Sequence, residues 1–301
     1  MKIVVGSRGS KLALTQTKWV IDQLRYKFPY VDFQIKIIKT KGDIIQNISL
    51  DKIGDKGLFV KEIENSLLSK SIDMAIHSMK DMPSVTPKGL IFTGIPKRED
   101  PRDALVLKEG YKSLEDLPKG ARIGTGSKRR KYQLLKVRPD LDIVSIRGNI
   151  ETRIEKIHTE NFHGIILAAA GLHRLGLNNR ISMYLSPEVI LPAPAQGSLA
   201  IEICDERKDI YDMVKEISCR ETMIQVKAER EFLKGVNGGC HIPVGALCTV
   251  IDDKIILDCI FGDEEGNKLV RKTKEGKIGE EQALGIELAQ AVIEELTDNE
   301  G

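Results

Sequence analysis

The stretch ARIGTGSKRR, residues 121–130, decides the fold class of this chain. Its first four residues have the pattern of a short buried strand, and Ser127 can cap a helix that follows at once. The same step from strand to helix occurs in KIVVGSRGS, residues 2–10, and in DIVSIRGN, residues 142–149. Such alternation indicates an α/β architecture with largely parallel sheets.

The alternation extends over the first two thirds of the chain, with an interruption at the charged stretch IPKREDPRD, residues 95–103. Residues 40–55 have the composition of a long loop. Helices are predicted at residues 10–28 and 58–68, from Ser127 and from Asn149. Strands are predicted at residues 2–6, 33–39, 72–76, 90–95, 121–124, 142–146 and 164–168.

The last third has a different pattern. The stretch LSPEVILPAPAQG, residues 185–197, contains three prolines and is typical of an extended connection between domains. Beyond it, short turns separate strand patterns, which indicates an antiparallel meander covered by helices. The predicted helices span residues 219–234 and 278–296, and the strands span residues 244–251, 254–261 and 268–274.

Composition narrows the function classes. A length of 301 residues suggests two or three domains. The 46 Lys and Arg residues against 44 Asp and Glu residues argue against a nucleic-acid coat or a polybasic membrane binder. No apolar run approaches the ~18 residues of a membrane-spanning helix, and MKIVVGSRGSKLAL lacks the apolar centre of an export signal. We therefore expect a cytoplasmic protein.

The five cysteines are an odd number without a CxxC pair, so we expect neither a disulfide framework nor a zinc site. Cys240 differs from the others because it follows two glycines in VNGGCHIPVG, residues 236–245. A thiol on such a loop can be a nucleophile, an attachment point or an incidental residue. A Cys/His protease pair with His241 is disfavoured, because adjacent side chains there point apart.

Ten of the 16 arginines lie between residues 98 and 180. The planar guanidinium fork suits carboxylates and phosphates, so this density favours a small polyanionic ligand. The alternative is that these arginines form salt bridges on solvated helices.

Polar side chains follow several predicted strands at the ends where ligands bind in α/β sheets. GSRGS, residues 6–10, places Arg8 before a helix N-terminus, which is either an anion site or a simple tight turn. HSMKD, residues 77–81, brings Lys80 and Asp81 to a strand end, where the alternative is a polar turn with Asp81 as a cap.

Two further turns repeat this arrangement in the arginine-rich part. GTGSKRR, residues 124–130, has the hydroxyls and arginines of an anion cradle but lacks the spacing of a nucleotide P-loop. SIRGN, residues 145–149, places Arg147 at a strand end and Arg153 one helical turn further.

Together these segments resemble the porphobilinogen deaminase (hydroxymethylbilane synthase) family. Gly126, Lys128, Asp55 and His241 depart from the usual residues at their positions. The matching segments, in the order of the family, are RGSKLALTQ (8–16), KGLFVKEIE (56–64), DMAIHSMKDMP (73–83), REDPRDA (98–104), GTGSKRR, IRGNIETR (146–153), AAAGLHRLGL (168–177), PAPAQG (192–197) and NGGCHIPVG (237–245).

The resemblance implies a monomer of three domains. Residues 1–96 and 195–217 would form a discontinuous α/β domain 1 with the catalytic Asp, and residues 97–194 an arginine-rich α/β domain 2. These two would be lobes like those of periplasmic binding proteins around a cleft. Residues 218–301 would form a smaller α+β domain 3 with an antiparallel sheet and the loop of Cys240.

The activity implied is that of a transferase of haem and porphyrin biosynthesis. It joins four porphobilinogen units head to tail, releases ammonia at each step, and yields the linear tetrapyrrole hydroxymethylbilane. A dipyrromethane cofactor, linked to Cys240 through a thioether, would prime the chain, and no metal is implied. Each pyrrole carries an acetate and a propionate, which accounts for the arginines.

The resemblance also assigns roles to single residues. Asp81, Arg8 and Lys80 would be catalytic, with Asp81 stabilising the cation left when ammonia departs. Cofactor contacts would come from Cys240, Ser10, Lys80, Thr125, Ser127, Arg129, Arg130, Arg147 and Gln196. Substrate contacts would come from Arg8, Arg147, Arg153, Lys52, Lys56 and Phe59.

Two other classes remain open at the level of sequence. A two-lobed solute-binding or ligand-sensing protein for small polyanions would explain the arginines but would leave Cys240 without a role. Nucleic-acid binding by residues 98–180 would require a basic surface, which the near-neutral charge disfavours.

Overall fold

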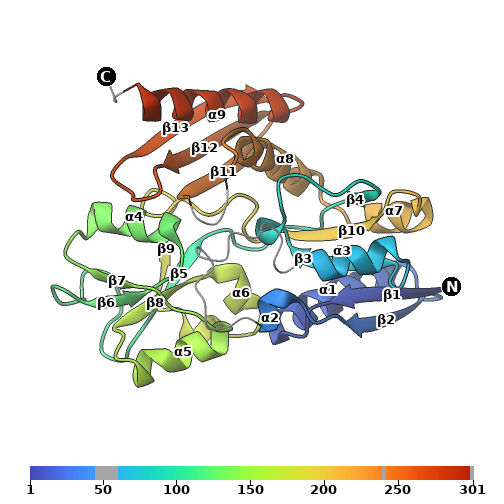
Figure 1. Ribbon diagram of the computed structural model, residues 1–301, viewed down its shortest axis with the longest axis horizontal. Helices are drawn as coiled ribbons and strands as arrows, with labels where there is room; N and C mark the ends of the chain where they lie inside the picture. The colour runs from blue at the N-terminus through green and yellow to red at the C-terminus, as the bar shows by residue number, and fades with distance from the viewer. Residues whose placement is uncertain (45–59, 239–241, 299–301) are drawn as a thin grey trace. The chain divides into compact units, whose positions relative to one another are not determined.

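The computed structural model describes residues 1–44, 60–238 and 242–298. The described residues fall into two compact units, which we treat separately (Figure 1). The first contains the described residues among 1–99 together with 197–223, and the second contains those among 100–196 and 224–298. The predicted boundaries of the three domains stay predictions.

The first unit is built on a five-stranded sheet in the order β2-β1-β3-β10-β4. β1 is parallel to β2 and β3, whereas β10 is antiparallel to β3 and β4. The strands are β1 (Lys2–Ser7), β2 (Asp32–Ile37), β3 (Met74–Ser78), β4 (Leu90–Phe92) and β10 (Leu199–Cys204). The helices are α1 (Lys11–Lys27), α2 (Lys41–Ile44), α3 (Lys61–Leu68), α7 (Lys208–Lys215) and the 3₁₀ turn η2 (Met79–Asp81).

Helices cover both faces of this sheet and so bury two apolar layers. Ser10 starts α1 as its N-cap by accepting a hydrogen bond from the Ala13 amide at 3.3 Å. Val20 and Leu24 of α1 then pack on the sheet with residues of α7. α3 packs on the opposite face through Ile63 and Leu67. The turns that follow β1 and β3 are therefore held by a sheet that is buried on both sides.

The second unit repeats this plan in residues 103–185, with a sheet in the order β7-β6-β8-β5-β9. β6 is parallel to β7 and β8, and β5 is antiparallel to β8 and β9. The strands are β5 (Asp103–Leu107), β6 (Arg122–Gly124), β7 (Asp142–Val144), β8 (Gly164–Ala168) and β9 (Met183–Leu185). The helices are α4 (Lys128–Val137), α5 (Ile150–Thr159), α6 (Ala169–Arg174) and the 3₁₀ turn η3 (Asn178–Arg180).

The expectation of largely parallel sheets is wrong, because each sheet has as many antiparallel as parallel strand pairs. The predicted α/β class is confirmed. The antiparallel strands β5 and β10 enter the middle of each sheet from distant parts of the chain. Such long-range insertion leaves no signature in the local alternation of strands and helices.

The second unit also contains the predicted antiparallel sheet, in the order β11-β12-β13. Apolar residues of α8 and α9 pack against it in one core, and Figure 1 shows α9 along β12 and β13. The elements are α8 (Arg220–Gly235, in this unit from residue 224), β11 (Val244–Ile251), β12 (Lys254–Gly262), β13 (Leu269–Lys277) and α9 (Glu281–Thr297). None of the described helices is long and apolar enough to cross a membrane.

Candidate functional site

The turn between β1 and α1 holds Arg8 against a carboxylate. Arg8 Nη2 lies 2.5 Å and Nε 3.1 Å from Asp43 Oδ1, and the Thr40 hydroxyl donates to Asp43 Oδ2 at 2.8 Å. Burial by itself raises the pKa of Asp43, but the hydrogen bonds from Arg8 and Thr40 outweigh it and hold this pKa below its usual value. Asp43 therefore fixes the direction of Arg8. Sequence reasoning missed Asp43, because it lies in a polar segment without any pattern.

Lys80 and Asp81 lie in the turn η2, directly after β3. The Met79 amide donates to the Ser198 carbonyl at 3.0 Å, and the Gln16 amide group donates to the Ser78 hydroxyl at 3.1 Å. Asp81 is exposed, and Lys80 is half-buried. Because β1 and β3 are parallel neighbours, the turns that carry Arg8 and Asp81 leave the same edge of the sheet.

In the second unit, Asp103 binds both arginines of the GTGSKRR turn. Arg129 Nη1 donates to Asp103 Oδ2 at 2.7 Å, and Arg130 Nε and Nη2 donate to Oδ1 at 3.0 and 2.7 Å. The Gln196 side-chain amide adds a hydrogen bond to Oδ1 at 2.9 Å. Asp103 is fully buried, and Arg129 is only 5% exposed. The two predicted cofactor-binding arginines thus share an internal carboxylate that sequence reasoning did not single out.

The charges of this cluster keep Asp103 ionised. Burial raises its pKa, but the neighbouring guanidinium groups of Arg129 and Arg130 outweigh burial and hold the pKa far below its usual value. Arg130 also donates through Nη1 to the Ile166 carbonyl, so each of its three nitrogens has a protein partner. Arg129 differs, because within the described chain only its Nη1 has partners, namely Asp103 and the Leu191 carbonyl.

The other side chains of this turn organise its backbone. The Ser127 hydroxyl caps α4 by accepting from the Arg130 amide at 3.4 Å, and the buried Thr125 hydroxyl accepts from the Ser127 amide at 3.2 Å. Lys128, one of the departures from the family pattern, donates through Nζ to the Glu264 carbonyl at 2.8 Å. It therefore points to the turn between β12 and β13 and leaves the arginine cluster undisturbed.

Arg147 follows β7 and presents a buried donor without a partner. Its Nη1 atom has no hydrogen-bond partner among the described residues. Gly148 adopts a φ of 118°, which L side chains rarely adopt, and Asn149 then caps α5 by accepting from the Thr152 amide at 2.8 Å. A buried guanidinium nitrogen without a partner is costly, so it is the kind of donor that an external carboxylate would satisfy. Arg153 Nε donates to the Gly148 carbonyl at 2.7 Å and braces this turn.

These turns lie at one edge of the second unit's mixed sheet. β6, β7 and β8 are parallel, so Thr125 and Arg147 leave the sheet on the same side. β5 runs in the opposite direction, which brings its first residue, Asp103, to that edge. The remaining predicted site residues, Lys52, Lys56, Phe59 and Cys240, lie outside the described residues, as do the departures Asp55 and His241.

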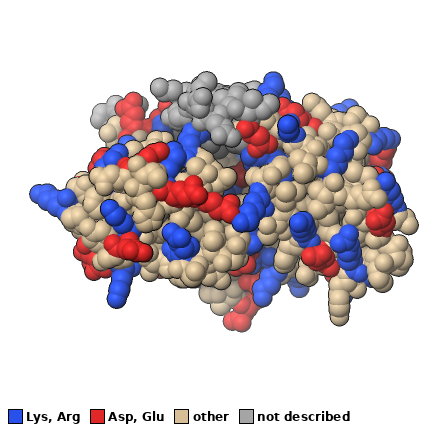
Figure 2. Space-filling model, turned by 90° about the horizontal axis from the view of Figure 1, so that it is seen from below, with Lys and Arg blue, Asp and Glu red and all other residues tan. Residues whose placement is uncertain are grey.

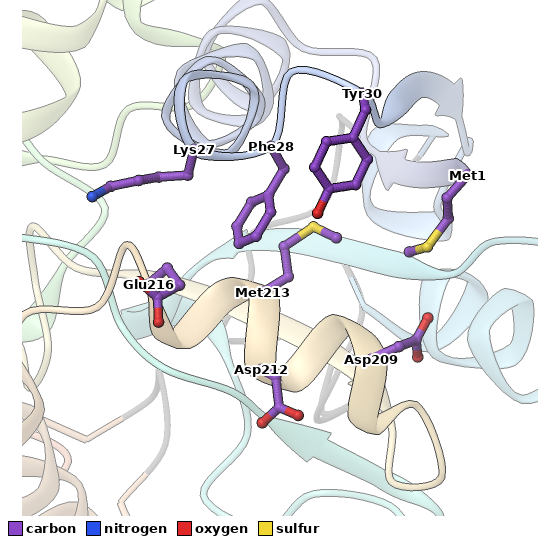
Figure 3. A pocket seen from close by; sticks show the side chains of 8 residues that line it. All are labelled: Met1, Lys27, Phe28, Tyr30, Asp209, Asp212, Met213 and Glu216. Carbon is purple, nitrogen blue, oxygen red and sulfur yellow. The ribbon is translucent and has the colours of Figure 1, made fainter.

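A cavity of about 500 Å³ in the first unit is a different feature. Figure 3 shows the rings of Phe28 and Tyr30 facing Met213, whereas the carboxylates of Asp209 and Asp212 point away from both rings. It lies beside the amino-terminal start of β1, away from the turns above, and its acidic rim does not suit a polyanion. The lining residues are Met1, Lys27, Phe28, Tyr30, Asp209, Asp212, Met213 and Glu216.

Neither the surface charge in this view nor the arrangement of possible metal ligands indicates a further site among the described residues. On the face in Figure 2, described Lys and Arg side chains are interspersed with Asp and Glu, without a continuous basic stripe. The part of the chain that the structure describes contains no group of three or more His, Cys, Asp or Glu residues arranged for a metal ion. Of the four described cysteines, Cys204, Cys248 and Cys259 are buried and Cys219 is half-buried, and none of these four forms a disulfide.

Arginine-bearing turns at the ends of parallel strands define an α/β protein of the class that binds small anions. Comparison with family models then gives the family. Residues 3–212 match the model described as "Porphobilinogen deaminase, dipyromethane cofactor binding domain", and residues 223–294 match "Porphobilinogen deaminase, C-terminal domain". The chain belongs to the porphobilinogen deaminase family.

Curated relatives support this assignment over the full length. The chain is 60% identical to the porphobilinogen deaminase of Clostridioides difficile, with complete coverage of both chains. Identity to that of Clostridium novyi is 56% over 98% of this chain and 100% of the relative, and identity to that of Listeria welshimeri is 50% over 98% of each. The chain is thus a transferase that makes tetrapyrrole from porphobilinogen and carries a dipyrromethane cofactor-binding domain.

Solved structures with a similar fold include binding proteins. One is the probable amino-acid ABC transporter extracellular-binding protein ytmK of Bacillus subtilis, with a TM-score of 0.43 and 13% identity over 72% of this chain and 90% of that chain. Another is an arginine-specific periplasmic binding protein of Salmonella typhimurium, with a TM-score of 0.39 and 16% identity over 72% of this chain and 91% of that chain. The family assignment disfavours the solute-binding alternative for this chain.

Proposed function

We propose that this chain joins four porphobilinogen units into hydroxymethylbilane and that the turns described above bind and activate the growing chain. The observation that carries the proposal is the buried Nη1 of Arg147, which has no partner among the described residues and is a donor that a ligand carboxylate would satisfy. The Nε and Nη2 atoms of Arg129 would add a second fork for a carboxylate.

The residues present fit a ligand that carries several carboxylates. Arg147, Arg129, Thr125, Ser127 and Gln196 come from the second unit and would hold the dipyrromethane. Arg130 acts there through Asp103, because its nitrogens already have protein partners. We also assign cofactor contacts to Ser10 and Lys80. When bound, the dipyrromethane supplies the pyrrole carbon to which the first substrate unit is joined.

Asp81 is the residue that we assign to proton handling. Its carboxylate is exposed at the end of β3 and can accept the pyrrole N–H of a bound substrate. Loss of ammonia leaves positive charge on that pyrrole, and a nearby carboxylate stabilises this charge. Arg8, held by Asp43, and Lys80 would orient the substrate's carboxylates.

The remaining assignments concern the attachment of the cofactor, the residues that contact substrate, and the compartment and oligomeric state of the protein. We assign the thioether to Cys240 because a thiolate is the most nucleophilic side chain available in proteins at neutral pH. Arg147 and Arg153, with Lys52, Lys56 and Phe59, would contact incoming substrate. The protein would act as a cytoplasmic monomer.

An intact-mass measurement of the purified protein tests this function. We expect the polypeptide mass plus two pyrrole rings, and further steps of one ring after porphobilinogen is added. A bare polypeptide that gains no mass with porphobilinogen would contradict the proposal.

A further inference from the structure

A buried cluster of three ionisable side chains lies under α3 in the first unit. It consists of His77 on β3, Glu202 on β10 and Glu64 on α3, which are 6%, 0% and 7% exposed. We call it the His77 cluster. The proposed chemistry uses none of its members, and groups of this kind are rarely buried without a role or a partner.

Strand register brings two members together. Ala200 lies opposite His77, and Glu202 lies opposite Ala75, so His77 and Glu202 are diagonal neighbours on one face of the sheet. His77 Nε2 lies 3.2 Å from Glu202 Oε2. The contact is an ion pair by distance, but it is not an aligned hydrogen bond, because both atoms lack a hydrogen-bond partner among the described residues.

The protonation of the third member follows from its surroundings. Burial raises the pKa of Glu64, and the charge of Glu202 raises it further. His77 and Lys61 lower this pKa, but by less than burial and Glu202 raise it. Two buried carboxylates beside one imidazole would leave an uncompensated negative charge. The raised pKa favours the neutral form of Glu64, which reduces that charge, and leaves the contact between His77 and Glu202 as the close polar pair of the cluster.

The His77 cluster is continuous with the turn that carries Lys80 and Asp81. Only Ser78 separates His77 from the first residue of η2. Met79 is tied to the strand that bears Glu202, through its hydrogen bond to Ser198 just before β10. A change at His77 would therefore be transmitted directly to η2.

We propose that His77 is a positioning residue for Lys80 and Asp81: its close contact with Glu202 anchors the end of β3 and so holds η2 in place. This inference rests on the proposed function of the two η2 residues. His77 does not itself exchange protons with substrate.

The test compares His77→Gln with the double variant His77→Gln/Glu202→Gln. The single variant removes the imidazole that can pair with the buried Glu202 carboxylate, whereas the double variant leaves two neutral amides that can hydrogen-bond each other. Hydrogen exchange of the Met79 and Met82 amides should accelerate about 10-fold or more in the single variant and return toward wild type in the double variant. The kcat should fall about 10-fold with KM changed less than about 2-fold, and it should recover in parallel.

Amide hydrogen exchange and kcat together distinguish a failure of the positioning role of His77 from a failure of the proposed function of η2. Unchanged exchange in His77→Gln, or exchange and kcat that stay altered in the double variant, would overturn the positioning role. Faster exchange with unchanged kcat would support the anchoring by His77 and contradict the proposed function of η2.

Glu64→Gln gives a second measurement that does not depend on activity. A folded-state pKa raised above the usual 4.5 means that stability from neutral Glu64 is present at low pH and is lost as pH rises through the folded-state pKa. The variant, in which the amide mimics the neutral acid, should lack this loss in unfolding experiments across pH. Identical pH dependence in the two proteins would overturn the inference that burial beside Glu202 raises the pKa of Glu64.

Discussion

The arginines at the strand ends differ in what their nitrogens contact. Arg130 is fully committed to Asp103 and Ile166, whereas Arg147 keeps a buried nitrogen without a partner among the described residues. Arginine side chains at the strand ends of this sheet therefore differ in whether the protein itself uses all of their donors. Arg130 builds the edge, and Arg147 is the arginine that we propose for binding a ligand.

Replacing Arg147 by Leu should weaken substrate binding without unfolding the protein. We expect KM for porphobilinogen to rise at least about 10-fold, because one charge-assisted hydrogen bond contributes about 1.5–3 kcal/mol. Arg147→Lys should recover only part of the loss, since lysine lacks the planar fork. Arg122→Leu, which changes a half-exposed arginine of the same unit, is the matched control. A KM equal to wild type in Arg147→Leu would refute the assignment.

Asp103→Asn should change how stability depends on pH. The folded-state pKa of Asp103 is far below the usual 3.8, so its stabilisation is present at neutral pH and is lost as pH falls below that value. The variant leaves two buried guanidinium groups without a carboxylate, which should cost about 3–5 kcal/mol at pH 7. Denaturant unfolding at pH 7 and below pH 4 should show this cost shrinking with acid. A constant difference between the proteins would count against the prediction.

Asp81→Asn and Asp81→Glu separate charge from position at η2. Asn keeps the size of the side chain but loses the charge, so turnover should fall about 10²-fold or more. Glu keeps the charge but shifts it by one methylene, so slow condensation should survive. Single-turnover assays with porphobilinogen give the order of the rates. If Asn equals wild type or exceeds Glu, charge at residue 81 does not drive the reaction.

At the scale of elements, the helix starts could be predicted from sequence and the central antiparallel strands could not. Ser10, Ser127 and Asn149 are the observed N-caps, because capping depends on residues that are close in sequence. β5 and β10 pair with β8 and β3, which are distant in sequence, and no local pattern indicates such pairing.

In the candidate site, too, only residues marked by a local sequence pattern could be predicted. The sequence placed arginines and Asp81 at strand ends, because a turn after a strand is a local pattern. Their partners Asp43 and Asp103 were missed, since pairing across 35 and 26 residues has no local pattern to indicate it. Glu202 was missed for the same reason.

The turn between β12 and β13 packs on α4, and one glycine makes this possible. A Cβ on Gly266 would lie 2.2 Å from the ring of Tyr132. Gly266→Ala should therefore destabilise the protein by about 1–3 kcal/mol from overpacking, in addition to strain at its positive φ. Gly120→Ala is the matched control, because its φ is 75° and nothing lies within 4 Å of its Cβ position. Equal losses of unfolding free energy in both variants would show that the Tyr132 contact is irrelevant.

At the scale of the whole molecule, the proposed covalent attachment of the cofactor would distinguish this protein from one that only binds its ligand. Cys240→Ser should give a folded protein whose intact mass lacks the two pyrrole rings, because a serine hydroxyl is a far weaker nucleophile. Cys219→Ala, which removes a half-buried free thiol, should keep them. Two rings still attached in Cys240→Ser would place the attachment elsewhere.

The insertion of β10 between β3 and β4 has a consequence for biosynthesis on the ribosome. The first sheet lacks its internal strand until residue 204 has left the exit tunnel, although β1 to β4 end at residue 92. By then all five strands of the second mixed sheet, residues 103–185, have already been translated. The first third of the chain therefore cannot complete its sheet until a later segment is translated, so we expect a departure from the usual rule that the first domain translated is the first to fold.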